Sequence, residues 1–328
     1  MKLLNQLGWR HYASKQPASI GKARLGRVRR VDRGEVDALT EEGELRVASD
    51  SQRTTIDLAP ATGDWITIGD DPDIGFHIET ILPRYSSISR RDPAEQEKEQ
   101  VLVSNVDFVG ITCSVDRPPN IAKIERFLIL AQDSDAVPLL ILTKVDQGIS
   151  EGWNQLQQEI RDVITIQTSS VTGTGISEVR EQLSPDKTLV LLGESGVGKS
   201  TLVNELVGEA VQQTTEVRSR DNKGRHTTIA RELMLIPSGG ILIDTPGIRG
   251  IGLWDAKEAL NKVFFEISEV ASYCRFSNCT HQVEPDCAIL AAIQEKEIDP
   301  LRFERYLRLV EELDEQEERL ILQRRKSK

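Results

Sequence analysis

Apolar and polar residues alternate along the first part of the chain, and continuous apolar runs replace this pattern further on. Between residues 20 and 85, short alternating runs are separated by turns of Gly, Asp and Pro. Short strands at such close spacing predict a small β-barrel or sandwich. The expected strands include residues 23–32, 43–49, 64–70 and 77–84. The polar segment 89–100 is expected to be a linker or exposed turn beside a domain boundary.

From residue 101 onwards, buried strands are expected to alternate with amphipathic helices. The apolar runs are residues 106–115, 137–142, 163–167, 188–193, 232–237 and 240–244. Residues 120–132 and 150–163 have apolar positions at helical spacing. This alternation predicts βαβ units and a mostly parallel sheet that is covered on both faces.

Beyond residue 254 the pattern is helical. A helix is expected over residues 256–270, followed by a Cys- and His-rich stretch and by two helices that end in a charged tail. We therefore predict a multidomain protein of three units. They are an N-terminal β-barrel over residues 1–95, an α/β domain over 96–254 and an α-helical domain over 255–328.

Composition and charge narrow the class of protein. No apolar run approaches the roughly 20 residues that span a bilayer, and the N-terminus lacks the features of a secretory signal. Three of the four cysteines lie close together, which favours a reducing compartment and one metal site over disulfides. We therefore expect a cytoplasmic protein with no membrane partner. The net charge is −11, yet residues 1–30 carry eight basic and no acidic side chains, and such a cluster can contact phosphates.

Residues 193–200 match the phosphate-loop pattern G-x-x-x-x-G-K-[ST] between an expected strand and an expected helix. The glycines let backbone N–H groups point at phosphate oxygens, and the helix N-terminus adds partial positive charge. Lys199 is expected to reach the β- and γ-phosphates, and Ser200 to offer its hydroxyl to Mg²⁺. The expected nucleotide-binding residues of this segment are Gly193, Glu194, Ser195, Gly196, Val197, Gly198, Lys199, Ser200 and Thr201.

A second motif, DTPG, follows an expected strand and resembles the switch II motif of translation-factor-like GTPases. Its first residue, Asp244, can hold Mg²⁺ through water, and the N–H of Gly247 can hydrogen-bond a γ-phosphate. A phosphate loop occurs in ATPases and kinases as well, so these two motifs leave the identity of the base open.

Residues 143–146 (TKVD) resemble the guanine-specificity loop N-K-x-D, and residues 169–171 more weakly resemble the S-A-K loop. The carboxylate of Asp146 can accept two parallel hydrogen bonds from guanine, an arrangement that adenine does not offer. Thr143 stands where Asn is usual and lacks the amide that ties this loop to the phosphate loop, so we expect weaker affinity. The expected base-binding residues are Thr143, Lys144, Val145, Asp146, Ser169 and Ser170.

The motifs run in a circularly permuted order, because the base-binding loops precede the phosphate loop. Chain ends often lie close together, so the old ends can be joined and new ends cut while the sheet is kept. Switch II then leads directly into the C-terminal unit, on which the nucleotide state can act.

Switch I is expected within residues 223–228 (KGRHTT). One of the two threonines, Thr227 or Thr228, would complete the Mg²⁺ shell, and Thr228 is preferred. Ile248 follows DTPG where many GTPases use Gln to orient water, so His226 is the candidate for that role, with a surface or RNA contact as its alternative. The expected catalytic residues are His226, Lys199 and Thr228, and the expected Mg²⁺ ligands are Ser200, Thr228 and Asp244. We expect slow hydrolysis that needs a partner.

Cys274, Cys279, His281 and Cys287 supply three sulfurs and one imidazole within fourteen residues. Tetrahedral Zn²⁺ accepts this ligand set, and a closed site with four protein ligands is structural. One zinc ion is therefore expected to stabilise the C-terminal unit.

The chain as a whole resembles the ribosome small-subunit-dependent GTPase A family (RsgA/YjeQ type). The resemblance rests on TILPRYSSISRR, SNVDFVGI, TKVD, GESGVGKST, GRHTTI, DTPGIRG and CRFSNCTHQVEPDC, and it covers nearly the whole chain. It implies an N-terminal OB-fold that binds RNA, a circularly permuted GTPase domain and a zinc domain. It also implies late maturation of the small ribosomal subunit, with binding of the subunit and its rRNA and activation by the subunit.

RNA contacts are expected at residues 22–30, at residues 218–225 and around the zinc module. A monomer is expected. The alternatives are a P-loop ATPase or kinase, against which TKVD argues, and an RNA-binding module whose nucleotide site is only structural.

Overall fold

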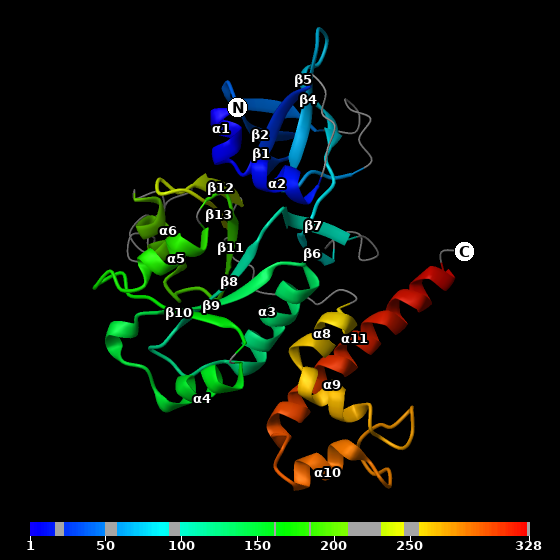
Figure 1. Ribbon diagram of the computed structural model, residues 1–328. Coiled ribbons are helices and arrows are strands. Elements are labelled where there is room, and N and C mark those ends of the chain that lie inside the picture. Colours follow the sequence, from blue (N-terminus) through cyan, green and yellow to red (C-terminus); the bar gives the residue numbers. More distant parts are fainter. Residues whose placement is uncertain are drawn as a thin grey trace, which may run out of the picture.

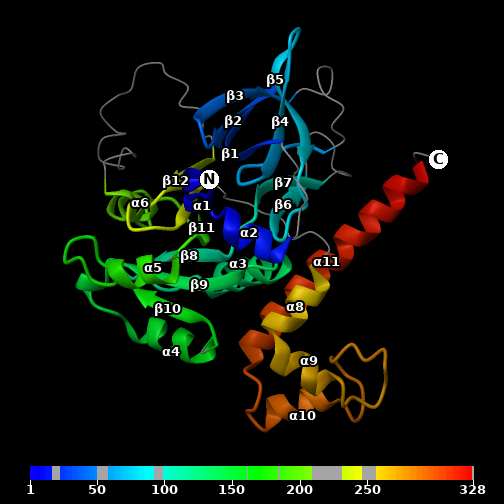
Figure 2. The ribbon, with the colours of Figure 1, turned by 45° about the horizontal axis from the view of Figure 1, so that its top comes forward.

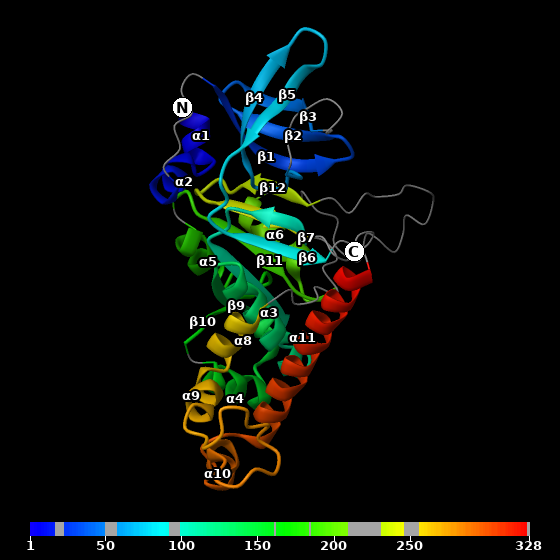
Figure 3. The same ribbon diagram turned by 90° about the vertical axis from the view of Figure 1, so that its right-hand side faces the viewer.

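The structure is a computed structural model that describes residues 1–16, 23–49, 58–91, 99–160, 162–183, 185–208, 231–245 and 256–326. Figure 1 shows a barrel, a sheet flanked by helices and a group of C-terminal helices, and Figure 3 shows the barrel and the C-terminal helices on opposite sides of the sheet. In the part of the chain that is described, no helix combines the length and the apolar character needed to cross a bilayer.

The N-terminal barrel confirms the predicted β-barrel. Its strands are β1 (Arg24–Asp32), β2 (Glu35–Thr40), β3 (Gly43–Ala48), β4 (Trp65–Asp71) and β5 (Gly75–Ile81). They close in the order β1-β2-β3-β5-β4, with antiparallel neighbours except for the parallel contact of β3 with β5. This five-stranded barrel has the OB-fold architecture. Inward-facing residues such as Val28, Val36 and Ile66 are fully buried and form its core.

Two short helices that the sequence pattern did not predict precede the barrel. They are α1 (Lys2–Gln6) and α2 (Trp9–Lys15). The ring of Trp9 packs at 5.0 Å and that of Tyr12 at 5.8 Å from the ring of Trp65 on β4. The helices therefore join the core between the barrel and the sheet, which explains the apolar residues at the start of the chain.

The central sheet confirms the predicted α/β domain. Its strands are β8 (Phe108–Ser114), β9 (Val137–Thr143), β10 (Ile164–Gln167), β11 (Thr188–Leu192), β12 (Glu232–Leu235) and β13 (Ile241–Asp244). They lie in the order β10-β9-β8-β11-β13-β12, and all neighbours are parallel except β12 with β13. Its helices are α3 (Ile121–Asp133), α4 (Glu151–Glu159), α5 (Ile176–Leu183) and α6 (Lys199–Val207).

Alternate residues of the inner strands face opposite cores, so both faces of the sheet are covered. Leu140 and Leu142 of β9 share a core with α3 and α4, whereas Leu139 and Ile141 share a core with α5 and α6. Burial on both faces explains why the strands are continuous apolar runs.

The polar segment 89–100 is not simply a linker, and that prediction was wrong at both its ends. A hairpin of β6 (Ser87–Arg91) and β7 (Glu99–Ser104) occupies them, while residues 92–98 lie outside the described part. Apolar neighbours explain the difference, because Ile88 and Val103 are fully buried. The hairpin also bonds to the barrel, since the Ser104 N–H donates to the carbonyl of Thr62 (3.0 Å).

The C-terminal residues form helices, as predicted. They are α8 (Lys257–Val263), α9 (Phe265–Ala271), α10 (Ala288–Gln294) and α11 (Pro300–Lys326). The single helix expected over residues 256–270 is instead two helices that break at Phe264 (φ −110°, ψ 44°). The break places the buried ring of Phe264 edge-on to Tyr306 of α11, at 5.5 Å.

The basic stretch 22–30, in which RNA contacts were expected, is largely committed to internal contacts. Arg27 is 1% exposed and donates to the carbonyls of Leu7 (2.6 Å) and Asn105 (3.0 Å) and to the Thr188 hydroxyl (3.0 Å). Arg29 forms ion pairs with Glu44 and Glu232. Arg27 therefore joins the barrel to the sheet and is not available to RNA, whereas Lys22 lies outside the described residues.

Candidate nucleotide and metal sites

Three of the predicted nucleotide-binding segments meet at one edge of the central sheet. Strands β8, β9, β11 and β13 are all parallel, so their carboxyl ends lie together. Thr143 at the end of β9 pairs in register with Ser114 of β8, and Asp244 at the end of β13 pairs with Leu191 of β11. Ligands of α/β proteins bind at this edge. The phosphate loop, residues 143–146 and Asp244 thus come together despite their reversed order.

The phosphate loop curls between β11 and α6 because of its glycines. Gly196 (φ 81°) and Gly198 (φ 91°) adopt left-handed conformations, and a Cβ on Gly193 would lie 2.4 Å from the Thr112 carbonyl oxygen. Lys199 begins α6 and bends back so that Nζ donates to the carbonyls of Gly193 and Glu194, both at 2.7 Å. Val197 is buried and Ser195 is exposed, while Ser200 and Thr201 are half-buried in the first turn of α6.

The amino group of Lys199 is partly buried near the carboxylate of Asp244. Burial lowers the pKa of Lys199, and the nearby charge of Asp244, which is 3% exposed, acts in the opposite direction. Two backbone carbonyls accept hydrogen bonds from the ammonium, and neutral carbonyls are weaker acceptors for it than anionic oxygens.

Thr143 ties its loop to the phosphate loop by another route than the usual amide. Its hydroxyl donates to the Val197 carbonyl (2.5 Å), and a Cβ on Gly198 would lie only 3.4 Å from the hydroxyl oxygen. The two loops are therefore joined although the amide is absent, and the weaker affinity expected from Thr143 stays a prediction. A hydroxyl on the shorter side chain reaches the neighbouring loop because the two backbones approach closely here.

The remaining residues of the expected base-binding segment hold one another in place. Lys144 adopts a left-handed conformation (φ 59°), and Val145 begins the 3₁₀ turn η1 (Val145–Gln147). The Asp146 carboxylate accepts from the hydroxyl of the fully buried Ser169 (2.5 Å). Next to it, Ser170 is half-buried. The Asp146 side chain is thus oriented while its residue stays exposed to solvent.

Two charged residues at this edge were missed by the sequence analysis. Asp116 accepts from Lys144 Nζ (2.6 Å) and from the Ser114 hydroxyl (2.6 Å), and the Lys144 hydrogen bond in particular lowers the pKa of Asp116 to about 2. Lys123 of α3 pairs with Glu194 of the phosphate loop (2.6 Å). The position of Asp116 just after the strand 106–115 was the signal that could have revealed it, since that strand ends at the ligand-binding edge.

His226, Thr227, Thr228, Gly247 and Ile248 lie outside the described residues. Thr245 is the last described residue before residues 246–255. Its hydroxyl donates to the Leu191 carbonyl (2.6 Å) and so fixes the end of β13 beside the phosphate loop.

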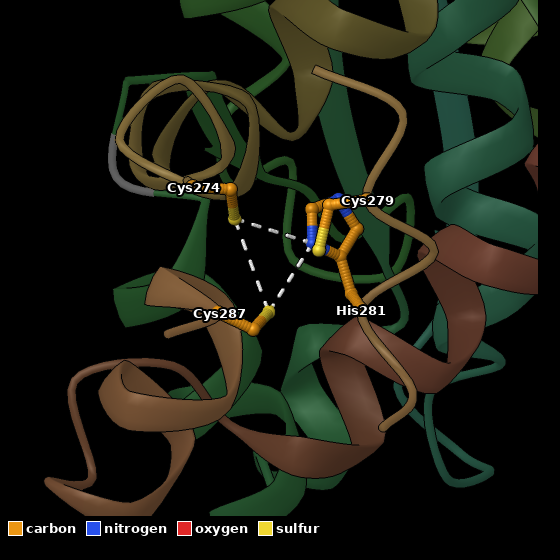
Figure 4. Close-up of side chains that lie close together, drawn as sticks. All are labelled: Cys274, Cys279, His281 and Cys287. Carbon is orange, nitrogen blue, oxygen red and sulfur yellow. Dashed lines mark hydrogen bonds between the residues drawn. The ribbon is translucent and has the colours of Figure 1, made fainter. Parts of the chain in front are cut away.

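The four predicted metal ligands converge in the C-terminal domain (Figure 4). Cys274 Sγ lies 3.9 Å from Cys287 Sγ, and His281 Nδ1 lies 3.5 Å and 3.4 Å from these two sulfurs. The ligand atoms of all four residues, Cys279 included, lie within 4.8 Å of one another. Tetrahedral Zn²⁺ bonds place sulfurs about 3.8 Å apart and sulfur and nitrogen about 3.5 Å apart. The four residues thus fit one tetrahedral ion.

The surroundings act differently on the ligands: they favour the metal-binding forms of Cys274 and His281, whereas burial and the neighbouring Cys287 and Cys274 thiols raise the pKa of Cys279 to about 11. Burial acts to raise the pKa of Cys274, but backbone N–H groups of Ile289 and Ala288 leave that pKa below its ordinary value. Burial lowers the pKa of His281, which favours its neutral form. The turn between the ligands is held by Glu284, which accepts from the N–H groups of Thr280 (2.7 Å) and Gln282 (3.0 Å).

Comparisons with known proteins agree with this arrangement. Residues 81–254 match the RsgA GTPase family. A protein of Streptomyces avermitilis named small ribosomal subunit biogenesis GTPase RsgA is 40% identical over 300 residues, which cover 88% of this chain and 79% of the relative. A protein of the same name from Methanosarcina acetivorans is 40% identical over 77% of this chain and 70% of its own length.

Solved structures show the same architecture. The crystal structure of YjeQ from Thermotoga maritima superposes with a TM-score of 0.62 at 26% identity and covers 88% of this chain and 98% of the YjeQ chain. YloQ, described as a circularly permuted GTPase, shares the fold with a TM-score of 0.61 at 22% identity over 89% of this chain and 96% of its own. The fold is thus an OB-type barrel, a circularly permuted P-loop domain and a helical metal-binding domain. From the family match and from the relatives, this chain belongs to the RsgA GTPase family and is a GTP-hydrolysing enzyme.

Proposed function

We propose that this GTPase binds the small ribosomal subunit and its rRNA during late maturation of the subunit, and that the subunit activates GTP hydrolysis. Relatives that match most of this chain are named small ribosomal subunit biogenesis GTPases. The observation that carries the proposal is this similarity over most of the chain, and the meeting of the phosphate loop and the base-binding loop at one sheet edge, through Thr143 and Val197, supports the GTPase site on which it depends. A permuted GTPase site within a chain similar to those relatives supports the same role.

In the proposed nucleotide site, the backbone of residues 193–201 surrounds the phosphates. Lys199 leaves its two carbonyl partners for the β- and γ-phosphates. Ser200, Asp244 and Thr228 would hold Mg²⁺, which supplies charge neutralisation between the phosphates. The N–H of Gly247 senses the γ-phosphate.

The proposed base site uses Asp146 as the guanine acceptor. Its carboxylate is held by Ser169, and the stem of Lys144 covers the face of the base while Asp116 holds the ammonium end. Backbone groups of residues 169–170 lie beside the guanine oxygen. Guanine is preferred because adenine would leave the Asp146 carboxylate without donors.

For catalysis we propose His226 as the residue that orients water, with Lys199 and Thr228 stabilising charge on the phosphates. Hydrolysis is slow until the subunit fixes the switch that contains His226. On the barrel, side chains other than Arg27 contact RNA. Residues 218–225 and the surface around the metal cluster also contact RNA.

We propose that the cluster of Cys274, Cys279, His281 and Cys287 holds one structural Zn²⁺, since three thiolates and one imidazole match its preference. The protein acts in the cytoplasm, where thiols stay reduced and can bind the metal. It acts as a monomer. We also propose units bounded at residues 1–95, 96–254 and 255–328.

GTP turnover with and without purified small subunits tests the proposed function. We expect turnover to rise at least ten-fold with subunits, and Lys199→Ala to abolish it in both conditions. Turnover that subunits leave unchanged would reject the proposal and favour an RNA-binding protein with a structural nucleotide site. Displacement of bound GDP by ATP at comparable concentration would favour a P-loop ATPase or kinase instead.

A further inference from the structure

Helix α3 connects the phosphate loop with the metal-bearing domain. Near its N-terminus, Lys123 Nζ lies 2.6 Å from the carboxylate of Glu194 in the phosphate loop. Arg117, just before the helix, lies 3.9 Å from the same carboxylate. In all three ribbon views α3 runs from the sheet to α8 and α11 (Figure 2).

The opposite side of α3 is fixed to the C-terminal domain by buried charges. Glu125 is 0% exposed and accepts from Arg305 Nε (2.8 Å) and Arg302 Nη1 (3.1 Å) of α11. One turn further on, the fully buried Ile129 belongs to the apolar core of α8, α9 and α11. Because a buried carboxylate that loses its partners is strongly destabilised, this end of the connection is rigid.

The contact between α3 and the phosphate loop is less tightly packed than the contact between α3 and α11. The side chains of Lys123 and Glu194 are 29% and 36% exposed. Beside them lies a cavity of about 40 Å³, lined among others by Cys113, Phe127 and Val197. Close packing is thus incomplete between α3 and the phosphate loop, and an ion pair spans the space. Small displacements of the loop can move Lys123 without breaking core contacts.

We propose that Lys123 is a positioning residue that sets the phosphate loop against α3, and that α3 carries nucleotide occupancy to the metal-bearing domain through Glu125. This inference rests on the proposed nucleotide site. When a nucleotide draws Lys199 away from the carbonyls of Gly193 and Glu194, the loop adjusts and α3 follows through Lys123. By linkage, the state of the C-terminal domain changes nucleotide affinity by the same factor.

A covalent path also leads from Asp244 to α8 through residues 246–255, so the experiment must separate the two routes. Hydrogen exchange of α8 and α11 is measured in the full-length protein with and without saturating GDP, and the Kd of GDP is measured by calorimetry. The variants are Lys123→Met, Lys123→Arg and, as a matched control, Arg319→Ala. Arg319 lies on the exposed far part of α11, where its guanidinium pairs with Glu315 (2.8 Å).

In the unmodified protein we expect GDP to slow exchange in α8 and α11. Lys123→Met should remove at least half of that slowing at saturating GDP and raise the Kd about two- to five-fold, as for a partly exposed ion pair. Lys123→Arg should restore both, and Arg319→Ala should change neither.

Full slowing in Lys123→Met would assign the coupling to residues 246–255 and overturn the proposal, as would GDP binding without any effect on α8 and α11. Calorimetry that detects no GDP binding to the unmodified protein would instead refute the proposed nucleotide site itself, and this inference with it.

Discussion

At the scale of single residues, the site depends on short hydrogen bonds between loops that are distant in sequence. The Thr143 hydroxyl bonds to Val197 across 54 positions, and the buried Ser169 orients Asp146. The motifs predicted which residues meet, but not that the Thr143 hydroxyl makes the contact to the phosphate loop in place of an Asn side-chain amide. That contact depends on the close approach of two backbones, which a motif does not encode.

Thr143→Val tests the contact to the phosphate loop. Valine keeps the shape of the side chain and removes the donor to the Val197 carbonyl, so we expect the Kd of GDP to rise about five-fold, equivalent to a hydrogen bond of about 1 kcal/mol. Thr143→Ser keeps the hydroxyl and serves as the control. Equal affinities for the three proteins in calorimetry would refute the role of the hydroxyl.

Asp146→Asn tests the base contact. The amide cannot accept both guanine donors, so preference for GTP over XTP should fall about 10- to 100-fold, in line with hydrogen bonds to a charged group. Competition between the two nucleotides measures the ratio. A ratio that the substitution does not alter would show that Asp146 does not read the base.

At the scale of helices and strands, the sequence predicted the elements that have a regular pattern of apolar residues. The six apolar runs from residue 106 to 244 are strands, and all of them except the edge strand β10, in which only Ile166 is buried, place side chains in the cores on both faces of the sheet. Elements stabilised mainly by distant partners were missed. Trp9 and Tyr12 of α2 need Trp65, and the helix break at Phe264 needs Tyr306.

The segment that carries the metal ligands, residues 272–287, contains little regular structure and should depend on the ion. We expect Cys279→Ala to lower bound zinc from about one ion per chain to well below one, because a structural site needs four ligands. Hydrogen exchange should rise most within this segment and less in α11, because most of the apolar core that α11 shares with α8, α9 and α10 lies outside the segment. Metal analysis that still finds one zinc per chain would contradict the assignment.

At the scale of the whole molecule, the buried carboxylate of Asp107 joins helix α2 to the sheet. Asp107 at the start of β8 accepts from His11 of α2 (2.6 Å), Lys15 (2.9 Å) and the Thr188 N–H (2.9 Å). Tyr85 lies at hydrogen-bond distance as well (3.2 Å). The sequence showed the basic residues of the N-terminus. It did not show that one of them, Lys15, pairs with Asp107, because such pairing depends on how the domains pack.

The pH dependence of stability tests this junction. Burial acts to raise the pKa of Asp107, but the Thr188 N–H, Lys15 and His11 leave it below the unfolded value of roughly 3.9. Its contribution is therefore complete above that value and is lost as pH falls through the folded pKa. Asp107→Asn should lower the free energy of unfolding by about 1–3 kcal/mol at pH 7, and the difference should shrink below about pH 4. A difference that is constant with pH would contradict the assignment.

The permuted order of the chain leaves the ligand-binding edge intact, since β8 and β9 precede β11 in sequence, yet β8 lies directly beside β11 in the sheet and β9 lies beside β8. A crystal structure with GDP bound is the most direct measurement of whether one guanine nucleotide occupies this edge. We predict the phosphates within the loop of residues 193–200, next to Lys199, and the guanine edge against the carboxylate of Asp146. A purine bound away from residues 143–146 would contradict the account.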